Sequence, residues 1–282
     1  MSRLPLVLLL ALIPACAGTT VQERPAPASP EPASPAPLDA ALFERVAILG
    51  ASVSAGFNLQ LETGVTTRMA DFLDEALLAP HAIAFDGATE MMFLDAVGMG
   101  TSMVEGALAV EPTLVLAIDF PFWFLYGPGS SSADRLDRLE VGLELLGRFD
   151  GPVVVGDIPF MADAAGGMIP HSSMPDADAF EPANARIAAW AAEDERRTLV
   201  SLASFNRTLR AGEDFAVAGR TWRPAEDGEL LQLDHLHPNM AGTAVLLIQA
   251  LSRLAEDRGE LLEGAVITHP EDLTDLVDDR LM

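Results

Sequence analysis

Short apolar runs, most of them closed by a glycine or an aspartate, are the feature that most limits the folds open to this chain. Segments with the apolar spacing of amphipathic helices lie between or after these runs. Strands that alternate with helices through short turns imply a parallel sheet with helices on both faces. The predicted strands are residues 46–49, 82–85, 113–118, 152–155 and 198–202, and the predicted helices are residues 66–78, 136–146, 187–193 and 241–255.

This order of elements predicts an α/β fold, a three-layer sandwich of the flavodoxin type whose central parallel sheet is covered by helices on both faces. In such sheets ligands bind outside the carboxyl ends of the strands. We therefore expect the chemistry of this chain in the residues that follow each strand.

The charge of the chain excludes several classes of function. With 42 Asp and Glu against 17 basic residues, the formal net charge is −25, so the chain lacks the cations from which nucleic-acid binders draw most of their affinity. All 17 basic residues are arginine, which excludes the lysine of a P-loop and Schiff-base catalysis. Half of the residues are hydrophobic, which indicates a folded globular protein.

Residues 1–16 have the pattern of an export signal. Arg3 is followed by the apolar stretch 4–13, which is too short to span a bilayer as a helix. Residues 13–16 resemble the box of bacterial lipoproteins, which implies acylation of Cys16 and a lipid-anchored protein at the periplasmic or cell-surface face of the envelope. An ordinary cleaved signal with an incidental cysteine is the alternative.

The rest of the chain divides into three parts by composition. Residues 17–40 form a linker with six prolines between positions 25 and 37, which favours a stiff polyproline II spacer. Residues 41–257 hold all the predicted strands and helices and form the folded domain. Residues 258–282 are an acidic tail that we expect to be exposed.

Two segments far apart in the chain carry residues suited to nucleophilic catalysis. Ser52 lies in a small-residue turn after the first predicted strand, where it is either a nucleophile or an ordinary capping serine. Asp234 precedes His237 by three residues, a spacing that lets the carboxylate fold back onto the imidazole and fix its tautomer. His235 and His237 also alternate like a metal-binding pair, but no third ligand accompanies them, so no metal is expected.

These blocks resemble those of the SGNH or GDSL serine hydrolases, over residues 46–254. Residues 50–52 match the first block of the family except that Ala51 stands where the family has aspartate, and residues 234–239 match its last block. The resemblance implies that Ser52 attacks an ester carbonyl, that His237 moves the proton and that Asp234 holds His237 in register. It implies no metal and no organic cofactor.

The resemblance also implies an oxyanion hole formed by Ser52, Gly87 and the residue at position 119. Residues 86–89 are similar to the glycine block of the family. Gly100 is a second candidate, and we favour Gly87 because it directly follows a predicted strand. In the third block Asp119 stands where the family has asparagine. An ionised carboxylate repels a developing oxyanion, and the loss of one donor raises the barrier by about 2.7 to 4 kcal/mol.

Two interpretations of Asp119 are open. Its apolar neighbours in the sequence favour a desolvated carboxyl whose raised pKa keeps it neutral and able to donate a hydrogen bond, and this is the hypothesis we favour. Alternatively, Asp119 points elsewhere and the oxyanion hole consists of the amides of Ser52 and Gly87.

The predicted function is serine-dependent hydrolysis of a carboxylic ester at the bacterial envelope, with a small molecule, a glycan ester or a lipid ester as substrate. Two alternatives use the same residues. One is a catalytically weak or inactive scaffold or binding lipoprotein, which the changes at Ala51 and Asp119 favour. The other is an acyltransferase that acts on envelope polysaccharide and differs only in the acceptor.

Overall fold

The computed structural model describes residues 36–128 and 131–281 of the chain. The predicted signal segment, Cys16 and most of the proline-rich linker lie outside the described residues. Within the described ranges, no helix combines the length and the apolar character needed to cross a membrane.

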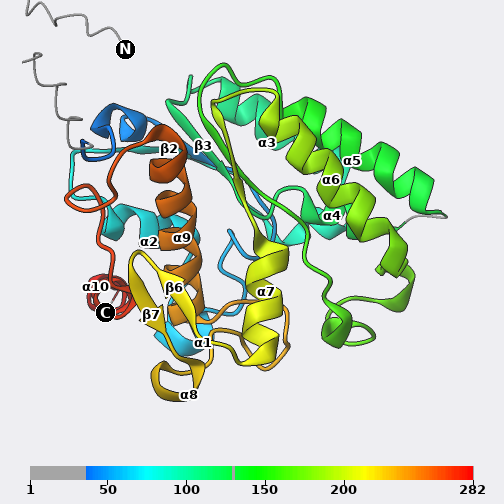
Figure 1. Cartoon of the computed structure of the whole chain (residues 1–282). Coiled ribbons are helices and arrows are strands. Elements are labelled where there is room, and N and C mark those ends of the chain that lie inside the picture. The colour runs from blue at the N-terminus through cyan, green and yellow to red at the C-terminus, as the bar shows by residue number, and fades with distance from the viewer. Residues whose placement is uncertain (1–35, 129–130, 282) are drawn as a thin grey trace, which may run out of the picture. The chain divides into compact units, whose positions relative to one another are not determined.

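The centre of the fold is a five-stranded, fully parallel sheet with the strand order β2-β1-β3-β4-β5 (Figure 1). All five predicted strands are confirmed, with bounds that differ by a few residues. Because β1 pairs with β2 on one side and with β3 on the other, the winding of the chain reverses at β1, and such a switch point is where ligands bind in this class of sheet. The strands are β1 (Val46–Ile48), β2 (Ile83–Asp86), β3 (Leu114–Ala117), β4 (Val153–Gly156) and β5 (Arg197–Val200).

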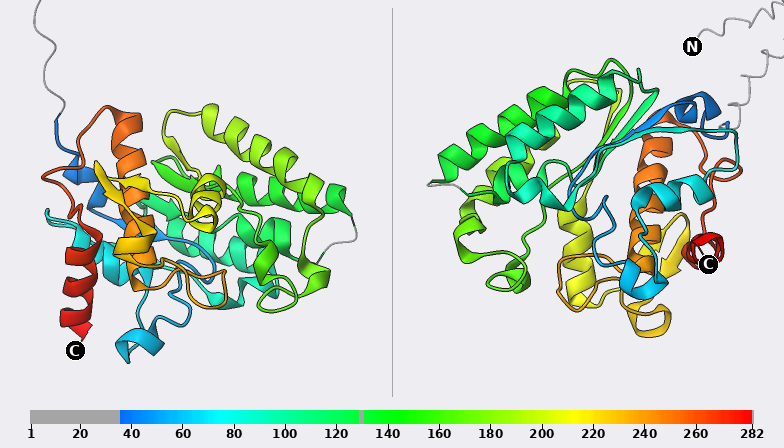
Figure 2. Two further views of the ribbon diagram at one scale, coloured as in Figure 1. Left: turned by 60° about the horizontal axis from the view of Figure 1, so that its bottom comes forward. Right: turned by 180° about the vertical axis from the view of Figure 1, so that it is seen from behind.

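Helices cover both faces of the sheet, as predicted (Figures 1 and 2). On one face lie α3, α5 and α6, and on the other lie α2, α9 and α10. A short antiparallel ribbon of β6 (Phe215–Val217) and β7 (Arg220–Trp222), which the sequence did not predict, contacts α9 through β6. The helices are α1 (Gln60–Thr63), α2 (Met69–Ala76), α3 (Ala96–Leu108), α4 (Phe122–Tyr126), α5 (Ser132–Leu146), α6 (Phe180–Ala192), α7 (Leu202–Ala211), α8 (Pro224–Asp227), α9 (Met240–Arg258) and α10 (Pro270–Leu281).

The strands direct alternate side chains into two hydrophobic cores. In β1, Val46 and Ile48 pack into the core that contains α2 and α9, whereas Ala47 packs into the core that contains α3 and α5. All three side chains are fully buried. Burial on both faces explains why β1, β3 and β4 are continuous apolar runs in the sequence and not alternating ones.

The residues on both sides of the predicted domain belong to the same compact unit, which corrects two expectations. Leu38, assigned to the linker, is buried, and its N–H donates to the carbonyl of Leu261 at 2.8 Å. The predicted exposed tail contains α10, whose Leu273 and Val277 are fully buried. These two residues are four positions apart and share one face of the helix, while most acidic residues of α10 are exposed, so its charge does not prevent packing.

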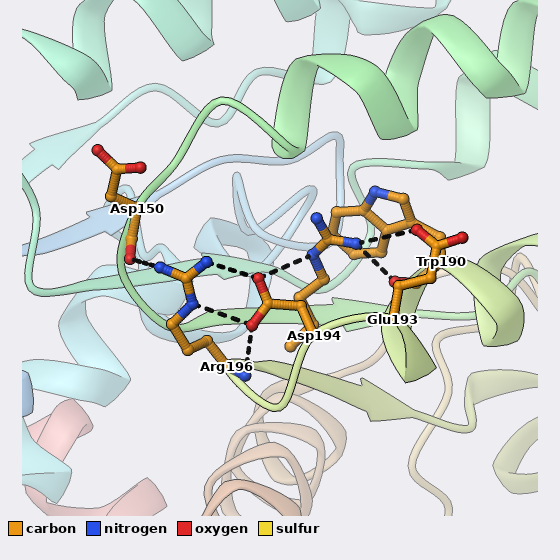
Figure 3. Close-up of polar contacts among 6 residues, drawn as sticks. Asp150, Trp190, Glu193, Asp194 and Arg196 are labelled. Carbon is orange, nitrogen blue, oxygen red and sulfur yellow. Dashed lines mark hydrogen bonds and ion pairs between the residues drawn. The ribbon is translucent and has the colours of Figure 1, made fainter.

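A cluster of polar contacts connects the end of α6 with the amino ends of β4 and β5 (Figure 3). Arg196 donates to both carboxylate oxygens of Asp194 and to the carbonyl of Asp150, and the Arg197 guanidinium lies 4.1 Å from the centre of the Trp190 ring. The hydrogen bonds from Arg196 hold the pKa of Asp194 below its usual value. The cluster lies at the edge of the sheet opposite to the carboxyl ends of the strands, and its role is structural.

Candidate active site

Ser52 lies in a tight turn just beyond the carboxyl end of β1, at the switch point of the sheet. The turn is closed by two backbone hydrogen bonds of 2.9 Å, from Ala55 to the carbonyl of Ala51 and from Phe57 to the carbonyl of Ser52. Gly50 is required at its start, because a Cβ there would lie 2.1 Å from Oδ1 of Asp119. The sequence therefore places a serine side chain at the rim of the sheet on a closely packed turn.

The segment before α9 folds into a compact loop that presents His237. Oδ1 of Asp234 accepts hydrogen bonds from the N–H groups of Leu236 at 2.9 Å and of His237 at 3.0 Å. This is the fold-back that the three-residue spacing predicts. Asn239 then caps α9 by accepting from the N–H of Gly242 at 2.8 Å, so the loop is fixed to a long, buried helix.

The structure brings Ser52, His237 and Asp234 together in a line of hydrogen bonds. The Ser52 Oγ lies 2.9 Å from His237 Nε2, and His237 Nδ1 lies 2.7 Å from Asp234 Oδ2. A carboxylate at Nδ1 favours the tautomer with the proton on that nitrogen, which leaves Nε2 free to accept the proton of Ser52. His237 is only 3% exposed, so bulk water has little access to its ring.

Hydrogen bonds keep Asp234 ionised. Its partial burial on its own would raise the pKa of the carboxyl group. Donation from the backbone and the ring of His237 and from the backbone of Leu236 outweighs burial, and the pKa of Asp234 lies below its usual value. The residue therefore carries the negative charge that stabilises a protonated imidazole.

Two residues that the sequence did not reveal connect the serine turn to the histidine loop. The side-chain amide of Gln232 donates to the carbonyls of Phe57 and Pro238, both at 2.8 Å. The ring of Phe57 packs against the His237 ring with centroids 4.3 Å apart. Neither residue belongs to a recognisable motif, because their role depends on contacts between segments more than 170 positions apart.

The predicted oxyanion donors are arranged differently from the expectation. The N–H of Gly87 donates to the carbonyl of Ile48 at 2.9 Å, so it is not free to bind a substrate oxygen. Gly100 lies inside α3, where a Cβ would approach Phe124 to 2.8 Å, and it serves close packing. Among the residues that the structure describes, the N–H of Ser52 has no acceptor, which leaves it available to a substrate.

Asp119 points toward the turn that carries Ser52. Its Oδ2 accepts hydrogen bonds from the N–H groups of Val53 at 2.9 Å and Ser54 at 3.3 Å, and its Oδ1 lies 2.5 Å from the Ser54 Oγ. For the side chain of Asp119, the structure thus favours the second interpretation, in which Asp119 points elsewhere than the oxyanion. The Gly87 amide, which that interpretation also requires, is occupied by Ile48. The contacts of Asp119 support the backbone of the turn that follows Ser52.

Burial raises the pKa of Asp119, although hydrogen bonds from Ser54 and from the backbone of the turn oppose the shift. The direction agrees with the desolvation that the apolar neighbours in the sequence indicated. In its neutral form, however, the acid would donate to the Ser54 Oγ, which is its nearest side-chain partner. A raised pKa therefore does not make Asp119 a donor to the substrate.

The two histidines of the last motif have separate environments. His235 is exposed and adopts a left-handed backbone conformation with φ of 55°, whereas His237 is held between Asp234 and Ser52. Within residues 36–128 and 131–281, no group of three histidine, cysteine or acidic side chains is placed to hold a metal ion.

An apolar cavity of about 80 Å³ opens beside Ser52. Residues 51–53 and Asp119 form one end of it, and its walls come from α7, the loop around residues 230–238 and the start of α9. In Figure 1, α7 lies below the sheet, whereas α9 runs alongside the sheet and extends down to the level of α7. His237 is not among the residues that line the cavity, although its neighbours Leu236 and Pro238 are.

Comparisons with known proteins give likenesses of structure only. No family model and no curated protein sequence matches the chain.

Among solved structures, a provisionally assigned acylhydrolase of Bacteroides fragilis is 16% identical with a TM-score of 0.49, over 80% of this chain and 92% of that one. TesA is 18% identical with a TM-score of 0.45, over 76% and 99% of the two chains. The psychrotrophic esterase EstA of a Pseudoalteromonas species is 17% identical with a TM-score of 0.43, over 76% and 97%. Because these likenesses are remote, we base the function on the geometry of the site.

Proposed function

We propose that this protein is a divergent SGNH-type serine esterase that hydrolyses a carboxylic ester. The observation that carries the proposal is the continuous line from the Ser52 Oγ through His237 to Asp234, with separations of 2.9 and 2.7 Å. A nucleophile in hydrogen-bond contact with a base, which is itself oriented by a carboxylate, is the arrangement that acyl transfer requires.

The reaction follows from these contacts in two halves. His237 Nε2 takes the proton of Ser52 as the Oγ attacks the ester carbonyl, and the negative charge on the carbonyl oxygen is stabilised by the N–H of Ser52. His237 then gives the proton to the alcohol as the bond between carbon and alcohol oxygen breaks. Water, deprotonated by His237, attacks the acyl-serine. His237 then returns this proton to the Ser52 Oγ as the bond between the acyl carbon and the Oγ breaks, which releases the carboxylic acid and free Ser52.

The cavity beside Ser52 receives the acyl part of the ester in this proposal. The leaving alcohol must lie next to His237 Nε2 to take its proton. Since His237 does not line the cavity, the alcohol departs on another side and the cavity remains for the acyl group. Its apolar walls favour a hydrocarbon chain.

Hydrolysis of p-nitrophenyl acetate by the wild type and by Ser52→Ala tests the proposal. We expect the substitution to lower kcat by about 10³-fold or more. Ser252→Ala is the matched control, because the buried Ser252 Oγ on α9 makes no hydrogen bond within the described residues and its loss should leave kcat unchanged. Equal rates for Ser52→Ala and the wild type would instead favour a non-catalytic scaffold, which the occupied Gly87 amide also favours.

We further propose that the protein is exported to the bacterial envelope and anchored there through lipid on Cys16. Support comes from the sequence of residues 1–16 and the proline-rich spacer that follows. The mass of the mature protein isolated from its native membrane tests the anchor. A diacylated or triacylated amino-terminal Cys16 is expected, and an unmodified terminus downstream of Cys16 would contradict it.

A further inference from the structure

One polar side chain interrupts the apolar face that α7 turns toward the cavity. Four residues of α7 line this cavity, at the spacing i, i+3, i+4 and i+7 of a single helix face: Leu202, Phe205, Asn206 and Leu209. Three of them are apolar, as the periodicity requires. Asn206 is the exception, because it places a polar carboxamide at a position where the helix periodicity predicts an apolar side chain.

Asn206 is only 8% exposed, and its side chain forms no hydrogen bond with any residue in the described ranges 36–128 and 131–281. Its amide atoms are nevertheless not among the fully buried side-chain atoms that lack a partner, so the amide is open to the space that the residue lines. Other asparagines near the site are satisfied: Asn184 bonds both backbone groups of Ile158, and Asn239 bonds the carbonyl of Glu229 and the N–H of Gly242. Because the rest of this face of α7 is apolar, a ligand group that pairs with the open amide of Asn206 would explain its presence.

The start of α7 is fixed by the end of β4, so Asn206 is held in place. The Asp157 carboxylate accepts from the N–H of Ala203 at 2.6 Å and from the Ser201 Oγ at 2.9 Å. Among the described residues, Asn206 alone lines both the cavity beside Ser52 and a neighbouring cleft bordered by Glu181 and Arg207. Its amide thus lies at the boundary between an apolar cavity and a polar cleft.

We propose that Asn206 is a specificity-determining residue that binds a hydrogen-bonding group on the acyl part of the substrate. The inference rests on the proposed esterase function and adds the substrate class: esters of short acids whose hydrocarbon chain carries a hydroxyl or a comparable polar group. Leu202, Phe205 and Leu209 contact the hydrocarbon part of the chain. The Asn206 amide, which has two N–H donors and a carbonyl acceptor, pairs with the polar group.

The size of the cavity limits the acyl group. A volume of about 80 Å³ has room for several water-sized groups, since a single water needs about 10–15 Å³. A short acyl chain of about four carbons with one hydroxyl group therefore suits the test. Longer chains would have to pass Asn206 into the neighbouring cleft.

The experiment compares three esters by pH-stat titration: ethyl butanoate, ethyl 3-hydroxybutanoate and 2-hydroxyethyl butanoate. The first has no hydroxyl group, the second carries it on the acid and the third carries it on the alcohol. Wild type should prefer ethyl 3-hydroxybutanoate to ethyl butanoate by at least about tenfold in kcat/KM, because a site built around a buried hydrogen-bonding group rejects an analogue that lacks the partner. Asn206→Leu should reverse this order, and Ser204→Leu, at an exposed position of the same helix, should preserve it.

Thermal unfolding distinguishes a role of Asn206 in substrate binding from a role in the stability of the fold. Asn206→Leu completes the apolar face, so its Tm should equal or exceed that of the wild type. A lower Tm together with an unchanged ratio of kcat/KM values would overturn the proposal in favour of a structural role. A preference for 2-hydroxyethyl butanoate would overturn the placement of the acyl group in the cavity.

The outcomes also separate this inference from the function on which it rests. If none of the three esters is hydrolysed in a manner that Ser52→Ala abolishes, the esterase function fails and the inference fails with it. If hydrolysis depends on Ser52 but the ratio of the first two esters is the same in the wild type and in Asn206→Leu, only the role of Asn206 fails.

Discussion

The groups that activate Ser52 are better formed in the structure than the groups that would bind the oxyanion. We call the first set the base side and the second set the oxyanion side. On the base side, His237 and Asp234 are placed with separations of 2.9 and 2.7 Å, and Asp234 accepts two further backbone hydrogen bonds. On the oxyanion side, the amide of Gly87 is occupied by Ile48, and Asp119 is turned toward the serine turn. Of the three predicted oxyanion groups, only the N–H of Ser52 is a donor without an acceptor among the described residues.

This difference suggests that nucleophile activation and transition-state stabilisation have separated in this chain. Formation of the nucleophile needs the base side alone, whereas fast turnover also needs donors for the oxyanion. A well-formed base side with one available oxyanion donor predicts an enzyme that reacts readily with activated esters. The absence of a second donor would cost roughly 10²- to 10³-fold in kcat.

The largest expected effect comes from disabling the base side. Asp234→Asn should lower kcat by about 10⁴-fold, because the amide favours the wrong tautomer of His237 and cannot stabilise its charged form. Steady-state hydrolysis of p-nitrophenyl acetate measures the loss. Asp279→Asn, at an exposed position of α10, is the control for the change of charge, and a comparable loss there would contradict the assignment.

A smaller effect is expected from removing the hydrogen bonds that Asp119 accepts from the turn after Ser52. Asp119→Ala should lower kcat by about 10²-fold, because the turn loses its contacts to Val53 and Ser54 and a displacement near 1 Å has a cost of this size. Asp119→Asn keeps an acceptor for the two N–H groups and should stay within a few-fold of the wild type. Equal losses in both variants would show that the negative charge of Asp119, and not its hydrogen bonds, matters.

The same residue predicts a dependence of stability on pH. Since burial raises the pKa of Asp119 above the ordinary value near 3.8, the folded state binds its proton more tightly than the unfolded state does. Its stabilising contribution is therefore complete below that ordinary value and is lost as the pH rises through the raised pKa. The free energy of unfolding of the wild type, relative to Asp119→Asn, should fall as the pH rises from 4 to 8 in urea titrations. A constant or rising difference would exclude a raised pKa.

The smallest effect concerns the ring that packs on His237. Phe57→Leu removes an aromatic contact worth about 0.5–1.5 kcal/mol and should lower kcat/KM by about two- to tenfold. Phe93→Leu removes a ring contact with Trp123 that involves no proposed catalytic residue and should have no effect on kcat/KM. A loss shared by both variants would point to general destabilisation.

Several features of the sheet and of the base side could be predicted from the sequence. The three central strands β1, β3 and β4 are predictable because burial on both faces makes them continuous apolar runs. The pairing of Asp234 with His237 is predictable because it is local and spans three residues. The placement of Ser52 follows from the strand that precedes it, since a residue after the first strand of such a sheet lies at the switch point.

The oxyanion side could not be predicted in the same way. A backbone amide is a free donor only if no other carbonyl accepts from it, and the sequence does not show that Ile48 accepts from Gly87. The direction of Asp119 depends on the path of the turn at Val53 and Ser54. The packing of α10 was missed because its acidic composition masked two apolar residues on one face, Leu273 and Val277.

Covalent labelling shows whether Ser52 is the nucleophile. The purified protein is incubated with a fluorophosphonate, digested and mapped by mass spectrometry. We expect one phosphonyl adduct, on the peptide that contains Ser52, which disappears in His237→Ala and persists in Ser252→Ala. A protein with no adduct, or with an adduct on another serine, would contradict the assignment of Ser52 as the nucleophile.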